Sequence, residues 1–228
     1  MKELILELAR QTANGEVSEE KAKANVRAIG KDVCLWNEMI DKIRQWSPLT
    51  PNAYFLADLL YEWAEKNFPP EYLYEAMMWK GWSSIVIDSP ASMDCFTRCH
   101  EYYVKNKMIQ KLYECYRVYG DGFALADRIA KAMEYYQQMM KLALENRNDK
   151  MLAIASYKVG AMQKKLGKIE EAFEGYEKAM ELMGSIDEEG LIAELTQSFL
   201  EMIKEFDLLE IRLEHYETLL EWIGRATV

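Results

Sequence analysis

Small and aromatic side chains recur at fixed intervals in the stretch SYKVGAMQKKLGKIEEAFEGYEKAMEL, which otherwise consists of good helix formers. The positions concerned are Gly160, Gly167, Ala172, Tyr176 and Ala179. The last three are spaced so that they lie on one face of a helix. A glycine inside a helix costs about 1 kcal/mol relative to alanine, so Gly160 is explained if a second helix approaches closely there. The stretch predicts two tightly packed antiparallel helices, with Gly167 in the left-handed conformation that ends the first.

The same pattern recurs on both sides of this stretch at one fixed interval. Ala132, Tyr136 and Met139 precede Ala172, Tyr176 and Ala179 by 40 positions, and Arg212, Tyr216 and Leu219 follow them by 40. Recurrence at a fixed period of this length is typical of repeat architectures, in which each unit buries its apolar face against its neighbours.

Apolar residues follow a helical period along nearly the whole chain, and strand-like alternation is hard to find. Breakers divide this pattern into helices joined by short turns. They are Asn14-Gly15, Pro48 to Pro51, Pro69-Pro70, Ser89-Pro90, Gly120-Asp121-Gly122 and Asn146 to Asp149. Pro51 suits the first turn of a helix. The sequence predicts an all-α chain.

Residues 153–184 resemble a tetratricopeptide repeat, because their glycine, alanine and tyrosine positions match the small and aromatic positions of that family. The segment departs from the family pattern at Ser156, where tryptophan is usual, and at Gly184, where proline is usual. Its period of 40 also exceeds the usual 34. The resemblance implies a superhelical stack of antiparallel helix hairpins, a tetratricopeptide-like α-solenoid. We expect repeats over 105–228 and a divergent helical region, which could be degenerate repeats, over 1–104.

The resemblance implies that the first helix of each pair lines a concave, partner-binding groove. The expected groove residues are Ile154, Tyr157, Lys158, Ala161, Lys164 and Lys165, with Lys107, Gln110, Glu114 and Arg117 as equivalents one repeat earlier. Lysines beside an aromatic ring could hold the carboxylates of a peptide. The alternative is that these lysines are ordinary solvated side chains.

The C-terminal region carries an apolar stripe that is unusually wide for a surface helix. Ile192, Leu195, Phe199 and Met202 form the stripe, and Trp222 adds aromatic area near the terminus. These residues are candidates for an oligomer interface, such as a homodimer. The alternative is that the last helix of the same chain covers them.

Charge and composition limit the classes of partner and compartment. The net charge is −10, and residues 169–228 contain 16 acidic and 4 basic side chains. This acidic end repels a phosphate backbone and argues against nucleic acid. The sequence has no apolar run long enough for a membrane span. Because its first stretch, MKELILELARQ, has glutamates within its apolar part, we expect that it is not a signal peptide. Its four cysteines suggest reduced thiols in the cytoplasm.

Motifs for catalysis and metal binding are missing from the sequence. The GxxxxGK[ST], GxGxxG, HExxH and GxSxG patterns do not occur. Cys95, Cys99, His100 and Cys115 could be read as metal ligands, but buried free thiols at core spacing explain them better. We therefore expect no cofactor, no metal and no enzyme activity. The predicted function is a protein-protein interaction module that binds a peptide or helix in its groove. The alternatives are a structural subunit and a peptide-sensing regulator.

Overall fold

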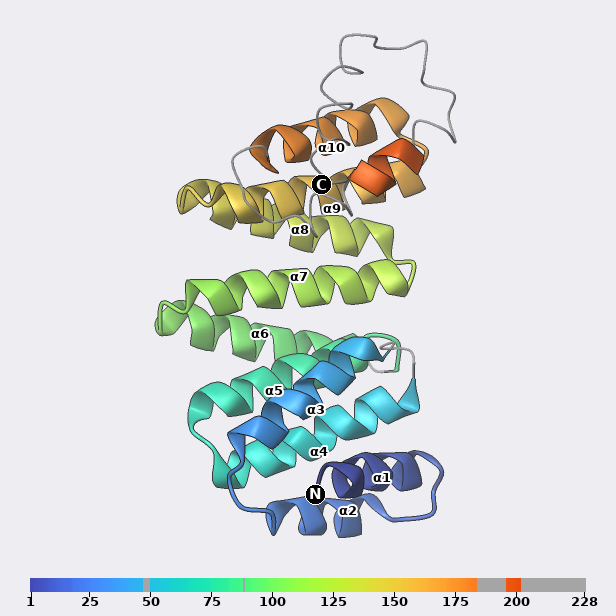
Figure 1. Ribbon diagram of the computed structural model, residues 1–228, viewed down its shortest axis with the longest axis vertical. Coiled ribbons are helices and arrows are strands. Elements are labelled where there is room, and N and C mark those ends of the chain that lie inside the picture. The colour runs from blue at the N-terminus through green and yellow to red at the C-terminus, as the bar shows by residue number, and fades with distance from the viewer. Residues whose placement is uncertain (47–49, 88, 184–195, 202–228) are drawn as a thin grey trace, which may run out of the picture. The chain divides into compact units, whose positions relative to one another are not determined.

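The computed structural model describes residues 1–46, 50–87, 89–183 and 196–201, and all regular structure in these ranges is helical. The helices are α1 (Lys2–Ala13), α2 (Glu19–Arg27), α3 (Val33–Gln45), α4 (Pro51–Asn67), α5 (Pro70–Ser83), α6 (Ser89–Lys105), α7 (Ile109–Leu125), α8 (Ile129–Glu145), α9 (Asp149–Lys165) and α10 (Ile169–Met183). Residues 196–201 are also helical. Neighbouring helices pack in pairs (Figure 1). The predicted fold class, an all-α stack of antiparallel helix hairpins, is confirmed.

The chain forms two compact units, Met1–Arg128 and Ile129–Val228. Helix α7 belongs to the first of these units and packs on α5 and α6. We call the two parts unit 1 and unit 2. Within the described ranges, no helix combines the length and apolarity needed to cross a bilayer.

The helices from α6 onward follow a constant step. They begin at residues 89, 109, 129, 149 and 169, so that each start lies half a repeat period after the one before. The residues at 107, 127, 147 and 167 all have positive φ, at 54°, 56°, 51° and 73°. Gly167 therefore has the predicted left-handed conformation, and Lys107, Asp127 and Arg147 adopt it at the same place in their turns. Two helices and two turns account for one full period.

The Gly120-Asp121-Gly122 stretch is helical, so the prediction of a turn there is wrong. It lies inside α7, where Gly120 stands one full period before Gly160. A Cβ atom at Gly122 would lie 2.8 Å from Cδ1 of Trp82 and would overlap Ile85. Gly122 therefore serves the close packing of helices and not a change of chain direction. Recognising Gly120 as the repeat glycine would have given the correct register for α7.

Sequence reasoning also missed a copy of the repeat in α5 and α6. Ser92, Phe96 and Cys99 lie one full period before Ala132, Tyr136 and Met139, on the second helix of a pair. Gly81 stands near the glycine position of the first helix. An added Cβ there would overlap the Tyr119 hydroxyl and lie 2.7 Å from Cβ of Cys95. This copy was hidden because serine and cysteine replace the alanines.

The core of unit 1 is built around aromatic side chains. Trp36 of α3 is fully buried, with its ring centroid 6.0 Å from that of Trp63, 5.0 Å from Phe68 and 5.3 Å from Tyr72. The indole N–H of Trp63 donates a hydrogen bond of 3.0 Å to the carbonyl of Ile29. The contacts of Trp36 attach α3 to the α4–α5 hairpin.

A buried carboxylate joins three helices of unit 1. Asp58 of α4 is 3% exposed and lies 2.8 Å from Nζ of Lys23 on α2 and 2.5 Å from Nζ of Lys80 on α5. Glu62, one turn later, pairs with Arg27 of α2. Buried carboxylates are rare without such partners, so this cluster fixes how α2 and α5 meet α4.

In unit 2, α9 packs on both α8 and α10. A Cβ atom at Gly160 would lie 3.0 Å from the carbonyl oxygen of Ala172. The predicted close approach of the two helices is therefore confirmed. Gly175 of α10 contributes equally, since a Cβ there would lie 3.0 Å from Cα of Gly160. The core continues through Ala153, Tyr157, Ala172, Tyr176, Ala179, Met180 and Phe199.

Candidate functional site

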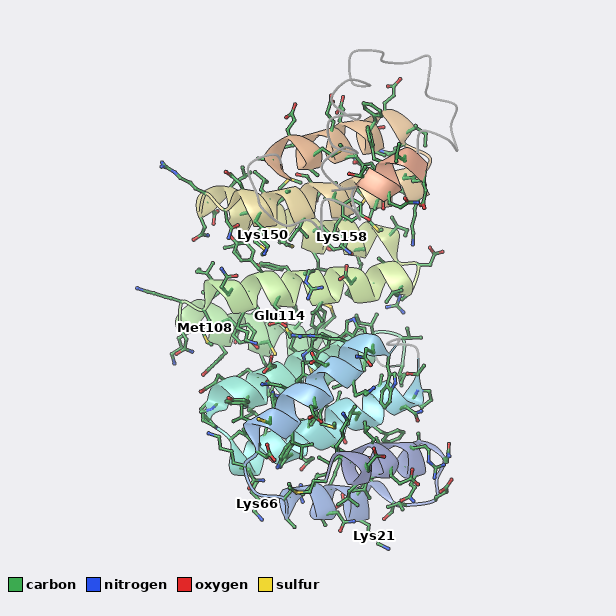
Figure 2. The ribbon with its side chains drawn as sticks, viewed as in Figure 1. Lys21, Lys66, Met108, Glu114, Lys150 and Lys158 are labelled. Atoms are coloured by element: carbon green, nitrogen blue, oxygen red, sulfur yellow. The ribbon has the colours of Figure 1, made fainter. Side chains whose placement is uncertain are left out.

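One helix of unit 1, α3, lies against the side chains of both α5 and α7. The indole N–H of Trp36 donates a hydrogen bond of 3.1 Å to Glu75 of α5. At the other end of α3, Arg44 donates a hydrogen bond of 2.8 Å to Glu114 of α7, which Figure 2 labels. Arg44 also lies over the ring of Trp79, 5.5 Å from its centroid. A helix from the same chain is therefore bound across α5 and α7, two helices of unit 1 that are separated along the chain by α6.

The residues of α5 and α7 that contact α3 belong to two lines of positions with the same spacing. We call them the docking face, which comprises Tyr72, Glu75, Trp79 and Trp82 on α5 and Lys111, Glu114, Val118 and Asp121 on α7. In each helix the positions are separated by three, four and three residues, which places them in one line along a helix surface. The separation of Glu75 and Glu114 along the chain is one position short of the repeat period.

Charged groups on the docking face are paired across the helices. Nζ of Lys111 lies 2.7 Å from Glu75 and 3.1 Å from Glu114. Burial alone would raise the pKa of Glu114, but Lys111 and Arg44 outweigh it and hold that pKa below its usual value. Burial lowers the pKa of Lys111, yet Glu114 and Glu75 raise it overall. The two carboxylates thus hold cations from α3 and α7.

The matching positions of α9 are Met151, Ile154, Lys158 and Ala161, each one full period after its counterpart on α7. All four side chains are partly exposed. Lys165 continues the line at the end of the helix and is exposed. Compared with α7, Ile154 replaces a glutamate and Lys158 replaces a valine. We call these five positions of α9 the α9 docking face. It is apolar and basic, whereas the matching positions of α7 combine acidic, basic and apolar side chains.

Most residues predicted for the groove on α9 lie on or beside this face. Ile154, Lys158, Ala161 and Lys165 are on it, and Lys164 lies beside it and is partly exposed. Tyr157 is different, because its side chain is 9% exposed and belongs to the core. Its hydroxyl lies 3.0 Å from Oγ of Ser198, and its ring centroid lies 5.4 Å from that of Tyr176. Tyr157 supports the face from beneath, while Lys158 lies with Nζ 5.9 Å from the Tyr157 ring centroid.

Of the groove residues predicted on and before α7, only some lie on or beside its docking face. Lys107 lies in the turn before α7, with φ of 54°, and does not line the helix face. Gln110 is exposed in the first turn. Arg117 is half-buried and pairs with Asp121 at 3.4 Å, next to the docking face. Glu114 is on the face itself. The register was displaced because the glycines of α7 were interpreted as a turn.

Of the interface candidates, only Phe199 lies within the described residues. It is 3% exposed and packs in its own chain, with its ring centroid 5.0 Å from that of Phe173 and 6.1 Å from that of Tyr176. The intrachain alternative therefore holds for this residue. Ile192, Leu195, Met202 and Trp222 lie outside the described residues.

Cys99, Cys115 and His100 pack among α5, α6 and α7, while Cys34 is exposed on α3. Cys99 donates a hydrogen bond of 3.2 Å to the carbonyl of Tyr74, and burial raises the pKa of Cys99 and of Cys115. His100 Nε2 lies 2.8 Å from the hydroxyl of Tyr116, and burial lowers the pKa of His100. No group of three or more potential metal ligands occurs in the part of the chain that the structure describes.

Comparisons with known proteins give a likeness of fold alone. No family model matches the chain, and no curated protein matches it. Among solved structures, the crystal structure of BtubC (BKLC) from P. vanneervenii is similar, with a TM-score of 0.50 and 12% sequence identity. The match covers 95% of this chain and 92% of that chain. It supports the helical stack, and the resemblance to tetratricopeptide repeats stays a prediction from the sequence.

Proposed function

We propose that this protein is a non-enzymatic protein-protein interaction module, and that the docking face of α9 binds a helix or peptide of a partner protein. The observation that carries the proposal is the position of α3. In unit 1, the corresponding positions of α7 and a closely similar line on α5 hold an amphipathic helix through one buried tryptophan, its hydrogen bond to Glu75 and the ion pair of Arg44 with Glu114. The resemblance of residues 153–184 to tetratricopeptide repeats points to the same function.

The chemistry of the α9 face indicates what kind of segment fits it. Met151, Ile154 and Ala161 offer apolar contact, while Lys158 and Lys165 supply positive charge. Glu114 of α7 binds an arginine, but the matching position of α9 is an isoleucine. Because the charged residues of the α9 face are lysines, the charged groups of its partner should be acidic. An amphipathic helix with an apolar stripe and acidic flanks meets these requirements.

A double charge reversal tests this proposal. Lys158→Glu with Lys165→Glu should abolish capture of partner proteins from a native lysate while the melting temperature stays within about 2 °C, because partly exposed positions tolerate such changes. The control is Lys168→Glu with Lys178→Glu, which makes the same charge change at exposed positions of unit 2. Capture by the wild-type protein should also weaken as salt increases, since salt screens exposed charges.

Two results would count against α9 as the binding face. One is a double variant that captures the same proteins as the wild type, and the other is a control that loses them equally.

The thiols support a cytoplasmic location as part of the proposal, because Cys34, Cys95, Cys99 and Cys115 are all free. Alkylation of the denatured protein from its native cells should modify all four of these cysteines without prior reduction.

A further inference from the structure

The docking face of unit 1 extends beyond the end of α3, where it forms a pocket. The pocket has a volume of about 230 Å³ and is lined mainly by Trp46, Trp79, Trp82, Val118, Leu125 and Arg117. These residues come from α5, α7 and the residue that follows α3. Small-molecule sites are usually larger, at roughly 300–1,000 Å³. The volume suits a single large side chain.

Aromatic and aliphatic side chains make up most of the pocket lining. Trp79 and Trp82 are 3% and 5% exposed, and their rings meet edge to face with centroids 5.5 Å apart. Val118 is buried beside them, while Leu125 is 55% exposed. Because little of these two rings is accessible, the partly exposed Trp46 and the exposed Leu125 offer most of the apolar contact to an inserted side chain.

The polar groups of the pocket differ in how many of their hydrogen-bond donors have partners within the chain. Arg44 is committed, because it bonds Glu114 and Asp41 and covers the Trp79 ring. Arg117 has one charged partner among the described residues, Asp121, at a long 3.4 Å. A guanidinium carries five N–H donors, so Arg117 can bind a second carboxylate. The buried indole N–H of Trp79 also has no acceptor in the described ranges.

We propose that this pocket binds one large apolar side chain of a partner peptide, with an adjacent acidic residue whose carboxylate accepts hydrogen bonds from Arg117. Arg117 supports the acidic neighbour, because its long ion pair with Asp121 leaves guanidinium N–H donors for a second carboxylate. The apolar side chain packs against the pocket lining, and the carboxylate gives Arg117 a second anionic partner. The site lies in unit 1 and does not depend on the function proposed for α9.

Three blocked dipeptides serve as probes: N-acetyl-aspartyl-phenylalaninamide, its asparaginyl analogue and N-acetyl-aspartyl-alaninamide. Ligand-observed NMR with the full chain should detect binding of the first in the millimolar range. Binding of the asparaginyl analogue should be roughly tenfold weaker, because it lacks the charge-assisted hydrogen bond. The alanine analogue should not bind, because it leaves the pocket empty.

Two variants locate the binding at this pocket. Arg117→Gln should remove the difference between the aspartyl and asparaginyl probes, and Leu125→Glu should weaken both phenylalanine probes severalfold. Arg98→Gln on α6 is the matched control, since Arg98 is an exposed arginine that pairs with an acidic residue of its own helix four positions away, as Arg117 does. The proposal is overturned if no probe binds in the millimolar range, if the alanine probe binds as well as the phenylalanine probe, or if Arg98→Gln has the same effects as Arg117→Gln.

Discussion

Gly81 allows a sharp prediction, because the space for a side chain at this position is already taken. An alanine there would push its methyl group into the Tyr119 hydroxyl and to within 2.7 Å of Cβ of Cys95. Forcing atoms into a packed core costs about 2 kcal/mol. Moving Tyr119 also breaks the 3.1 Å hydrogen bond from its hydroxyl to the carbonyl of Ser92, which costs about 1 kcal/mol.

The higher helix propensity of alanine offsets about 1 kcal/mol of this loss in the free energy of unfolding. The net expectation for Gly81→Ala is therefore a loss of about 2 kcal/mol in the free energy of unfolding, or roughly 4–8 °C in melting temperature. Urea unfolding followed by tryptophan fluorescence is a suitable assay, because five of the six tryptophans lie in unit 1. Gly30→Ala is the control, since a Cβ at Gly30 meets no atom within 4 Å.

The reasoning also predicts a partial rescue. Adding Tyr119→Phe removes the oxygen that the new methyl overlaps, so the double variant should be more stable than the sum of the two single changes predicts, by about 1 kcal/mol. A Gly81→Ala variant that is as stable as the wild type would refute the packing argument. Equal losses with and without the Tyr119 hydroxyl would show that the overlap is not the cause.

Three further predictions concern charge and backbone conformation. Asp58→Asn should cost about 3 kcal/mol in urea unfolding, because it leaves two lysines beside a neutral amide. Gly167→Ala should cost about 1 kcal/mol, since its φ of 73° strains any side chain although the space around it is open. The pKa of Glu114 is lowered in the folded protein, so its stabilising effect is present above its unfolded pKa and is lost as pH falls through the folded value. As the pH falls from just above the unfolded pKa to below the folded one, the wild type should thus lose more stability than Glu114→Gln, and parallel curves would contradict this.

The sequence allowed the helical class and the clearest repeat to be predicted, because each depends on local patterns. The glycine at position 160 and the small residues of α10 have one simple physical explanation, a close helix crossing, and the structure has that crossing. Proline and asparagine signals marked most helix ends for equally local reasons. The turns after α2, α6 and α7 were not marked in this way, and the two glycines inside α7 resemble a turn when the neighbouring helices are unknown.

The candidate site could be predicted only in part. The α9 line of Ile154, Lys158, Ala161 and Lys165 follows from helical periodicity alone. The burial of Tyr157 does not, because its ring packs against Tyr176 and its hydroxyl contacts Ser198, which is 41 residues away. Nor could the sequence indicate that α3 would bind across α5 and α7, since Trp36 and Glu75 meet through folding over 39 residues. Contacts of that separation need the three-dimensional arrangement.

The constant step from α6 to α10 restricts which insertions and deletions this region can accept. Odd-numbered and even-numbered helices have different roles, because α5 and α7 present docking faces while α6 carries the small and aromatic residues that pack behind them. Loss or gain of a single helix with its turn would exchange these roles for everything downstream and would turn apolar surfaces toward water. Only the loss or gain of a full period keeps the alternation, so lengthening or shortening of the chain here is expected in whole pairs of helices.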